Sequence, residues 1–315
     1  MRKALIVGVN DYPSSPLAGC VNDANEIAKL LELNEDGSPN FNVRLITCPT
    51  TAVTRSILKE AIDHLFSGDS EMALLYFSGH GYIDSTGGYL VTTDAQRYDE
   101  GVSMSDILTF ANASKARNKI IILDCCHSGS MGSPKLGATS LAQLSEGLSV
   151  LTASRDSEYA LELNGSGVFT SLLIDAFEGG AADIRGNITP GSLYAYVDEA
   201  LGAWDQRPIF KTNVSSFAAV RKVKPKVPFD ILRRITKYFS SPDLEHQLDP
   251  SYEFTDSRAI PENVTIFKEL QKLQGVGIVV PVGEEFMYYA AMNSRSCKLT
   301  ALGHQFWRLV NEKKL

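Results

Sequence analysis

From the N-terminus to about residue 220, short and wholly apolar runs alternate with amphipathic segments. The runs are bounded by glycine or polar residues, which is typical of strands buried in a parallel sheet. The amphipathic segments repeat their apolar residues with helical periodicity. This alternation predicts an α/β fold with helices on both faces of a mostly parallel sheet. The expected strands are Ala4–Val9, Val43–Ile46, Met72–Phe77, Ile120–Leu123 and Ser149–Thr152, and the expected helices are Asn22–Leu31, Thr54–Phe66, Ser105–Phe110, Phe169–Phe177 and Ser192–Leu201.

The composition changes after residue 222. The segment Lys222–Pro228 alternates lysine, valine and proline, which favours an extended and poorly packed connector. We therefore place one domain at residues 1–222, a linker at 223–228 and a second domain at 229–315. Within the first domain, Ser128–Ser140 and Gly179–Thr189 are rich in glycine and small residues, so we expect exposed loops there.

The C-terminal domain has a different pattern. We expect an amphipathic helix, two strand-like runs joined by a turn, and a closing helix, an order that resembles a winged-helix-like α+β module. The helix is Val264–Leu273, the runs are 275–281 and Phe286–Ala290, a polar turn follows at 293–296, and the closing helix contains Phe306–Val310. Residues 225–315 contain about 12 Lys and Arg and about 11 Asp and Glu. Since phosphate neutralisation supplies most of the affinity for DNA, we expect this domain to bind a regulatory protein or to restrain the first domain.

Composition and charge narrow the class of protein. The chain has 315 residues, 44% of them hydrophobic, and a net charge of −7, which argues against a surface that binds nucleic acid. No apolar run approaches the roughly 18 residues that a membrane-spanning helix needs, and the N-terminal run is too short for a signal sequence. The five cysteines have no disulfide spacing, so we expect reduced thiols in a cytoplasmic protein that has no membrane partner; they are Cys20, Cys48, Cys125, Cys126 and Cys297.

Two of the expected strands end in turns that carry nucleophilic chemistry. The first turn, in Tyr76–Gly81, places His80 between two glycines, and the second, Asp124–Gly129, has the sequence Asp-Cys-Cys-His-Ser-Gly. The carboxyl ends of parallel strands meet at one edge of a sheet, where such folds build their sites. An imidazole beside a thiol can remove its proton and later protonate the leaving amine. The sequence therefore predicts a thiol–imidazole pair at this edge.

The choice among the adjacent cysteines and histidines is open from this pattern alone. In an extended segment Asp124 and Cys126 share one side, while Cys125 and His127 share the other. His127 is too constrained by its position next to Cys126 to reach that sulfur, which favours His80 as the base.

The groups around this pair are candidates for an oxyanion hole and, less favourably, for a metal site. The backbone N–H groups of Gly81 and Cys126 are candidates for an oxyanion hole. A zinc site that combines the two cysteines with nearby histidines is disfavoured, because adjacent cysteines do not easily converge on one tetrahedral ion.

At these positions residues 1–220 resemble the caspase-like cysteine peptidases of family C14, in particular the metacaspases and their prokaryotic relatives. The Ser-Gly-His-Gly and Asp-x-Cys-His-Ser-Gly signatures are intact, with lesser matches at 8–12, 19–24, 167–170 and 206–208. The resemblance implies a caspase-like α/β/α sandwich and a cysteine endopeptidase. It implies that His80 is the general base, Cys126 the nucleophile and Cys125 a buried neighbour. No cofactor is expected.

The resemblance also implies a specificity pocket. In metacaspases the acids equivalent to Asp23 and Asp124 line this pocket, with the residues at Cys20 and Ser78 beside them. Two carboxylates in a partly desolvated pocket would bind a basic side chain and repel an acidic one. We therefore expect cleavage after Arg or Lys, with Arg favoured by its bidentate geometry. The alternative is that Asp23 caps a helix and Asp124 anchors the turn.

Two segments of the sequence bear on regulation of the activity. Many metacaspases bind calcium through an Asp-rich loop beyond the histidine motif, but residues 82–100 show no dense acidic cluster with calcium-ligand spacing, so we expect no metal. Lys135, in the region where caspases are often cut, is a candidate self-cleavage site. The resemblance to the prokaryotic relatives implies a regulated effector protease in a prokaryotic stress or antiviral defence pathway. The alternatives are a catalytically silent caspase-fold scaffold and a winged-helix regulator that acts by binding.

Overall fold

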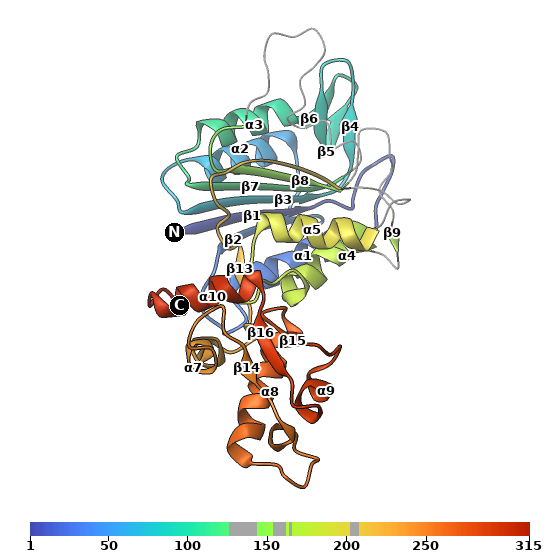
Figure 1. Cartoon of the computed structure of the whole chain (residues 1–315). Helices are drawn as coiled ribbons and strands as arrows, with labels where there is room; N and C mark the ends of the chain where they lie inside the picture. The colour runs from blue at the N-terminus through green and yellow to red at the C-terminus, as the bar shows by residue number, and fades with distance from the viewer. Residues whose placement is uncertain (126–143, 154–161, 164–165, 202–207) are drawn as a thin grey trace. The chain divides into compact units, whose positions relative to one another are not determined.

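The computed structural model describes residues 1–125, 144–153, 162–163, 166–201 and 208–315 (Figure 1). The chain divides into two compact units, Met1–Lys224 and Pro225–Leu315. Each unit has its own sheet. The expected active-site residues all belong to the first unit.

A six-stranded sheet with the order β12-β8-β7-β3-β1-β2 forms the centre of the first unit. Five of its strands are parallel, and they lie where the apolar runs predicted them: β1 (Arg2–Gly8), β2 (Asn42–Thr47), β3 (Met72–Ser78), β7 (Asn118–Asp124) and β8 (Leu148–Thr152). The edge strand β12 (Ile209–Asn213) pairs antiparallel with β8 and was not predicted. Its side chains are half-buried or exposed, so it lacks the continuous apolar run of the inner strands.

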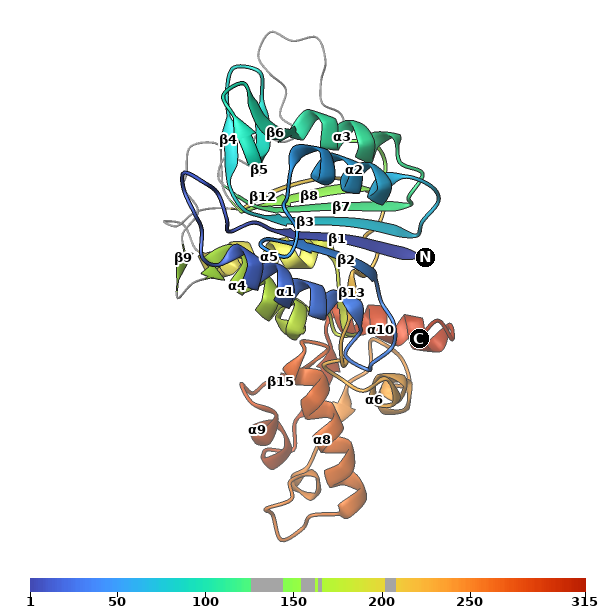
Figure 2. The same cartoon turned by 180° about the vertical axis from the view of Figure 1, so that it is seen from behind.

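Helices cover both faces of this sheet, as the views from the front and from behind show (Figures 1 and 2). On one face lie α2 (Arg55–Phe66) and α3 (Met104–Ala113), and on the other lie α1 (Cys20–Glu32), α4 (Val168–Asp175) and α5 (Pro190–Leu201). Successive side chains of a strand enter opposite cores: Leu75 and Phe77 pack towards α2 and α3, whereas Leu74 and Tyr76 pack towards α1 and α4. Burial on both faces explains why the inner strands are wholly apolar, and it confirms the expected α/β/α sandwich with a mostly parallel sheet.

The strand register brings three chain segments together at the carboxyl edge of the sheet. Gly8 is paired with Ser78, and Ser78 is paired with Asp124. A Cβ at Gly8 would lie 2.3 Å from the carbonyl oxygen of Cys20 and 2.7 Å from Cβ of Ala24. Only a glycine therefore lets the first turn of α1 approach the end of β1 this closely.

A small antiparallel sheet follows the histidine turn and was not predicted. It consists of β4 (Gly81–Ile83), β5 (Gly88–Gln96) and β6 (Asp99–Ser103). These strands are mixed in polarity and largely half-buried or exposed, so they lack the apolar runs by which the central strands were recognised. A second short hairpin, β9 (Glu162–Leu163) with β10 (Ser166–Gly167), precedes α4.

The segment Gly179–Thr189 is not the exposed loop that its composition suggested. It begins inside a π-helical turn, Ala176–Gly180, and contains β11 (Asn187–Ile188), which pairs with β13 (Arg221–Lys222). Ala181, Ala182 and Ile188 are buried in the core. The start of the expected linker is packed too, because Val223 donates its N–H to Gly186 and is itself buried. Small residues here allow close packing rather than exposure.

The second unit contains a three-stranded sheet with the order β14-β16-β15. The expected helices correspond to α8 (Pro261–Gly275) and α10 (Ala301–Asn311). The prediction of a strand at Phe286–Ala290 was wrong: α9 (Met287–Met292) is a helix that buries Met287, Ala290 and Ala291, three and four residues apart, while its tyrosines are exposed. The remaining elements are α6 (Phe229–Arg233), α7 (Ile235–Tyr238), β14 (His246–Gln247), a 3₁₀ turn at Pro250–Tyr252, β15 (Val279–Val282) and β16 (Ser296–Leu299). The expected hairpin is thus a strand–helix–strand unit.

Candidate active site

The two turns expected to form the site begin at the carboxyl edge of the central sheet, where β3 and β7 end side by side. His80 lies two residues beyond the end of β3, and Cys125 directly follows β7. Gly79 donates its N–H to the carbonyl of Asp124, at 3.3 Å, and so joins the two strand ends. Cys126, the expected nucleophile and oxyanion-hole donor, lies outside the described residues, as do His127 and Lys135.

Tyr12 anchors the backbone of His80. The N–H of His80 donates to the Tyr12 hydroxyl at 3.0 Å, and that hydroxyl donates to the carbonyl of Val91 at 3.2 Å. The two rings are in contact, with centroids 4.6 Å apart. A Cβ at Gly79 would lie 2.5 Å from the Tyr12 hydroxyl oxygen, which explains why a glycine precedes the histidine. The turn after β3 is therefore shaped around Tyr12.

The imidazole of His80 has a defined orientation. Its Nε2 lies 2.7 Å from the carbonyl oxygen of Ser15. A carbonyl can only accept a hydrogen bond, so Nε2 carries the proton and the neutral ring keeps its lone pair on Nδ1. Nδ1 is therefore the atom that can take a proton from a nucleophile, as a histidine base in thiol catalysis must do.

The loop that supplies Ser15 is held at several points. Asn10 accepts from the N–H of Val21 in the first turn of α1, at 3.1 Å, and donates to the carbonyl of Ala18. The sulfur of Cys48 accepts the N–H groups of Asn10 and Asp11, at 3.1 and 3.3 Å. Burial raises the pKa of Tyr12 far above its usual range, so its hydroxyl keeps the proton that it donates. These contacts fix the loop against the sheet edge.

Asp23 and Asp124 approach one another around a single glycine. The N–H of Gly167 donates to Oδ2 of Asp23 at 3.2 Å, and a Cβ on Gly167 would lie 2.6 Å from Oδ2 of Asp124. The two residues are only 1% and 6% exposed. Both lie near helix N-termini, those of α1 and α4, whose partial positive charge stabilises carboxylates. The structure thus brings together the two acids that were expected to line the specificity pocket.

The other expected pocket residues lie beside these acids. Ser78 is buried at the end of β3, opposite Asp124 in the register. Cys20 is the first residue of α1, one turn before Asp23, and is buried. Gly81, the expected oxyanion-hole donor, is the first residue of β4 and is partly exposed. Cys125 is 1% exposed and packs in the core on the side of α2 and α3, away from Asp124, as the side-chain alternation predicted.

Four residues that bond to the site were not assigned roles from the sequence: Tyr12 and Ser15 bond to His80, Thr170 bonds to Asp124, and Tyr76 bonds to Thr170. Tyr12 and Thr170 stand in the short stretches 8–12 and 167–170, which carried part of the family resemblance, but no function followed from that match. Tyr76 has the sequence pattern of an ordinary aromatic core residue of β3, so it suggested no role at the site. Ser15 acts through its backbone carbonyl, so its side chain gives no signal.

Within the described ranges, no group of three or more His, Cys, Asp or Glu side chains is arranged to hold a metal ion. The disfavoured zinc site includes Cys126 and His127, which lie outside those ranges. Over the same part of the chain, no helix combines the length and apolarity needed to cross a membrane.

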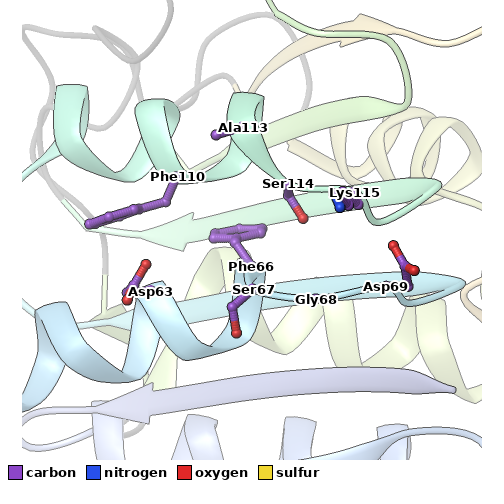
Figure 3. A pocket seen from close by; sticks show the side chains of 9 residues that line it. All are labelled: Asp63, Phe66, Ser67, Gly68, Asp69, Phe110, Ala113, Ser114 and Lys115. Atoms are coloured by element: carbon purple, nitrogen blue, oxygen red, sulfur yellow. The ribbon is translucent and has the colours of Figure 1, made fainter.

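A hollow of about 290 Å³ lies at the opposite edge of the sheet (Figure 3). It is formed where α2 and α3 end, before β3 and β7 begin. Its lining contains two aromatic rings and three charged side chains but no thiol and no imidazole: Asp63, Phe66, Ser67, Gly68, Asp69, Phe110, Ala113, Ser114 and Lys115. The groups that nucleophilic catalysis needs are therefore found at the carboxyl edge of the sheet and not in the lining of this hollow.

The fold is an α/β/α sandwich with a mostly parallel sheet, with His80 and Cys125 just beyond the ends of two neighbouring strands. The model of the caspase domain, peptidase family C14, matches residues 1–218. The chain therefore belongs to the caspase-domain family of cysteine peptidases. The unit Pro225–Leu315 lies outside that match.

Solved structures show the same fold. A protein of Geobacter sulfurreducens matches with a TM-score of 0.51 and 17% identity, over 71% of this chain and 97% of that chain. Caspase-1 from Spodoptera frugiperda matches with a TM-score of 0.50 and 12% identity, over 70% of this chain and 90% of that chain. No curated protein matches the sequence. At these identities the structural likeness concerns the fold alone.

Proposed function

We propose that this protein is a cysteine endopeptidase that uses Cys126 as nucleophile and His80 as general base. The observation that carries the proposal is the orientation of His80, whose Nε2–H donates to Ser15 and leaves Nδ1 to accept a proton. His80 stands at the end of β3, and the strand beside it, β7, leads directly to Cys125 and Cys126. A base of defined tautomer thus lies next to the strand that delivers the thiol.

The reaction follows from these groups. Nδ1 of His80 removes the thiol proton, and the thiolate of Cys126 attacks the scissile carbonyl carbon. The N–H groups of Gly81 and Cys126 hold the resulting oxyanion. The imidazolium gives its proton to the departing amine, which leaves a thioester on Cys126. Water, deprotonated by the same imidazole, then hydrolyses this thioester and restores the thiol.

We propose that Asp23 and Asp124 select substrates with Arg or Lys before the cleaved bond. Their carboxylates lie on either side of Gly167, close to the strand end that carries the nucleophile. In an environment with little water a guanidinium is bound strongly by carboxylates, and Arg can bond two oxygens at once. An acidic side chain would be repelled. Cys20 and Ser78 complete this pocket in the proposal.

We place this activity in the cytoplasm, where thiols stay reduced, within a stress or defence pathway of a prokaryote. The second unit, outside the caspase-domain match, is proposed to bind a regulatory protein partner or to restrain the peptidase. Its near balance of acidic and basic residues favours a protein partner over nucleic acid.

The test uses the full chain with fluorogenic peptides that end in Arg, Lys or Asp. The parent is expected to cleave after Arg and Lys, and Cys126→Ala and His80→Ala are expected to abolish turnover. Cys125→Ala is the matched control and should retain activity per folded molecule. Absence of turnover by the parent, also with candidate partners from its source cells, would overturn the protease assignment in favour of a scaffold. Cleavage after Asp would overturn the acidic-pocket proposal.

A further inference from the structure

A hydrogen-bonded chain of three buried side chains leads to one of the pocket acids. The hydroxyl of Thr170 donates to Oδ2 of Asp124 at 2.6 Å, and the hydroxyl of Tyr76 lies 2.6 Å from the same Thr170 oxygen. Thr170 and Tyr76 are fully buried and Asp124 nearly so. The chain joins three elements: β3 supplies Tyr76, α4 supplies Thr170, and β7 supplies Asp124.

The direction of the proton donation follows from the number of hydrogens available. Thr170 has one hydroxyl hydrogen, and it points to the carboxylate of Asp124. Tyr76 must therefore donate to Thr170 rather than accept from it. Burial raises the pKa of Tyr76 well above its usual range, and the nearby carboxylates of Asp124 and Asp23 raise it further, so Tyr76 stays protonated. Donors in series polarise one another and strengthen the final bond to the carboxylate.

Packing alone does not account for hydroxyl groups at these two positions. A valine at 170 and a phenylalanine at 76 would fill nearly the same volume in an apolar core, and a buried hydroxyl is costly unless it is hydrogen-bonded. Both hydroxyls serve the same end, which is to hold one oxygen of Asp124. Gly167, the residue before α4, holds Asp23 through its N–H, so the start of α4 bonds both acids.

We propose that Thr170, supported by Tyr76, is a positioning residue that determines specificity: it holds the Asp124 carboxylate in the orientation that binds a basic substrate side chain. This inference rests on the proposed function of Asp124. The substrate class is a peptide with Arg or Lys before the cleaved bond.

Removing the Thr170 hydroxyl should weaken recognition of charge rather than the chemistry. In Thr170→Val, Oδ2 of Asp124 loses a charge-assisted bond in a buried site, so kcat/KM for an Arg peptide should fall by about tenfold to a hundredfold. The loss should appear mainly in KM. A citrulline peptide has the shape of the Arg peptide without its charge, and its slow cleavage should change by less than about threefold. The Arg-to-citrulline ratio is therefore the quantity that the inference predicts.

The test measures kcat and KM for Arg and citrulline peptides with the full chain, together with the rate at which iodoacetamide alkylates Cys126. Thr170→Val should lower the Arg-to-citrulline ratio and leave alkylation unchanged, and Thr170→Ser should restore the ratio. Tyr76→Phe should shift it in the same direction by a smaller factor. Thr152→Val is the matched control, because Thr152 is equally buried and its hydroxyl has no hydrogen-bond partner within the described residues.

The outcomes separate this inference from the function on which it rests. A parent that cleaves no peptide would overturn the proposed function, and this inference with it. A parent that prefers Arg, with Thr170→Val keeping the parental Arg-to-citrulline ratio, would overturn the role of Thr170 and leave the protease assignment intact. If Thr170→Val fails to fold, as judged by its thermal melting, the role of Thr170 is tested with Tyr76→Phe and Thr170→Ser instead. A parental ratio in Tyr76→Phe would then contradict the inference.

Discussion

The imidazole Nε2 of His80 lies 2.7 Å from the carbonyl oxygen of Ser15, sixty-five residues earlier in the chain. This bond selects one tautomer of the neutral ring and leaves the lone pair on Nδ1, the atom to which the proposed mechanism assigns proton transfer. It connects the loop after β1 to the turn after β3, so the orientation of the His80 ring depends on the position of the earlier loop.

The tautomer can be observed directly. In the neutral form, 15N-labelled histidine spectra of the Cys126→Ala protein should show His80 protonated on Nε2, with Nδ1 at the chemical shift of an unprotonated nitrogen. The four other histidines provide internal references, and His80→Gln identifies the signal. A neutral ring protonated on Nδ1 would contradict the orientation described here.

Tyr12→Phe should slow catalysis with little effect on substrate binding. The substitution removes the acceptor of the His80 N–H and the donor to Val91, so the imidazole loses its backbone anchor. Leaving these groups unpaired should lower the free energy of unfolding by about 1–3 kcal/mol, and kcat should fall several-fold while KM changes little. Steady-state kinetics and urea unfolding measure both effects. Tyr98→Phe is the control, because Tyr98 is 82% exposed; an unchanged kcat in Tyr12→Phe would argue against positioning by Tyr12.

The adjacent cysteines should respond differently to serine. Cys126→Ser should reduce kcat by at least about a hundredfold, since a hydroxyl is a much weaker nucleophile than a thiolate at neutral pH. Cys125→Ser places a hydroxyl in an apolar core and should cost about 1–3 kcal/mol of stability, with kcat per folded molecule preserved. Active-site titration combined with thermal unfolding distinguishes the two effects. Loss of activity in a folded Cys125→Ser protein would reverse the assignment.

Gly167→Ala should disturb the acidic pocket without strain in the backbone. Gly167 has φ −65° and ψ 133°, which any residue adopts, but the new Cβ would meet Oδ2 of Asp124 at 2.6 Å. We expect kcat/KM for Arg peptides to fall by about tenfold or more, the loss expected for a charge-assisted bond, while alkylation of Cys126 by iodoacetamide continues at the parental rate. Gly275→Ala in α8 is the control, since nothing lies within 4 Å of its Cβ position. Equal activity of the two variants would count against close packing of Gly167 on Asp124.

The stability of the C-terminal unit should depend on pH through Glu269. Partial burial opposes ionisation, but hydrogen bonds from Arg234 and Tyr238 outweigh it and lower the pKa of Glu269 below its usual value of 4.5. A lowered pKa in the folded state means that the stabilisation is fully present above about pH 5 and is lost as the pH falls through the folded value. Glu269→Gln should therefore be less stable than the parent at pH 7, and the difference should shrink as the pH falls below the usual value of 4.5.

Fluorescence of Trp307, whose indole donates to Phe239, follows unfolding of this unit in a Trp204→Phe background. Glu285→Gln is the control, because Glu285 is an exposed glutamate of the same unit. A difference between the Glu269→Gln protein and the parent that is constant with pH would contradict the role of this carboxylate.

Hydrophobic pattern was sufficient for the central architecture, because strands buried on both faces must be apolar throughout. The runs ending at Phe77 and Leu123 located two neighbouring strands, and the turns after them located the site edge. Alternation along one strand also predicted that Asp124 and Cys125 are buried on opposite faces of the sheet. Where burial is incomplete the same reasoning failed, as in β12 and the sheet β4–β6, whose polar residues hide the strand pattern.

The sequence by itself determined the sheet and the edge at which the histidine and cysteine turns lie. It also identified Asp23 and Asp124 as candidates for the specificity pocket. Only the tertiary structure decided which nitrogen of His80 is free, because the deciding group is the Ser15 carbonyl and a backbone carbonyl has no residue signature. It alone joined Tyr76, Thr170 and Asp124, which belong to three elements whose contact depends on how α4 packs against the sheet. Local pattern encodes which face of an element is buried, whereas side-chain partners are set by packing between distant segments.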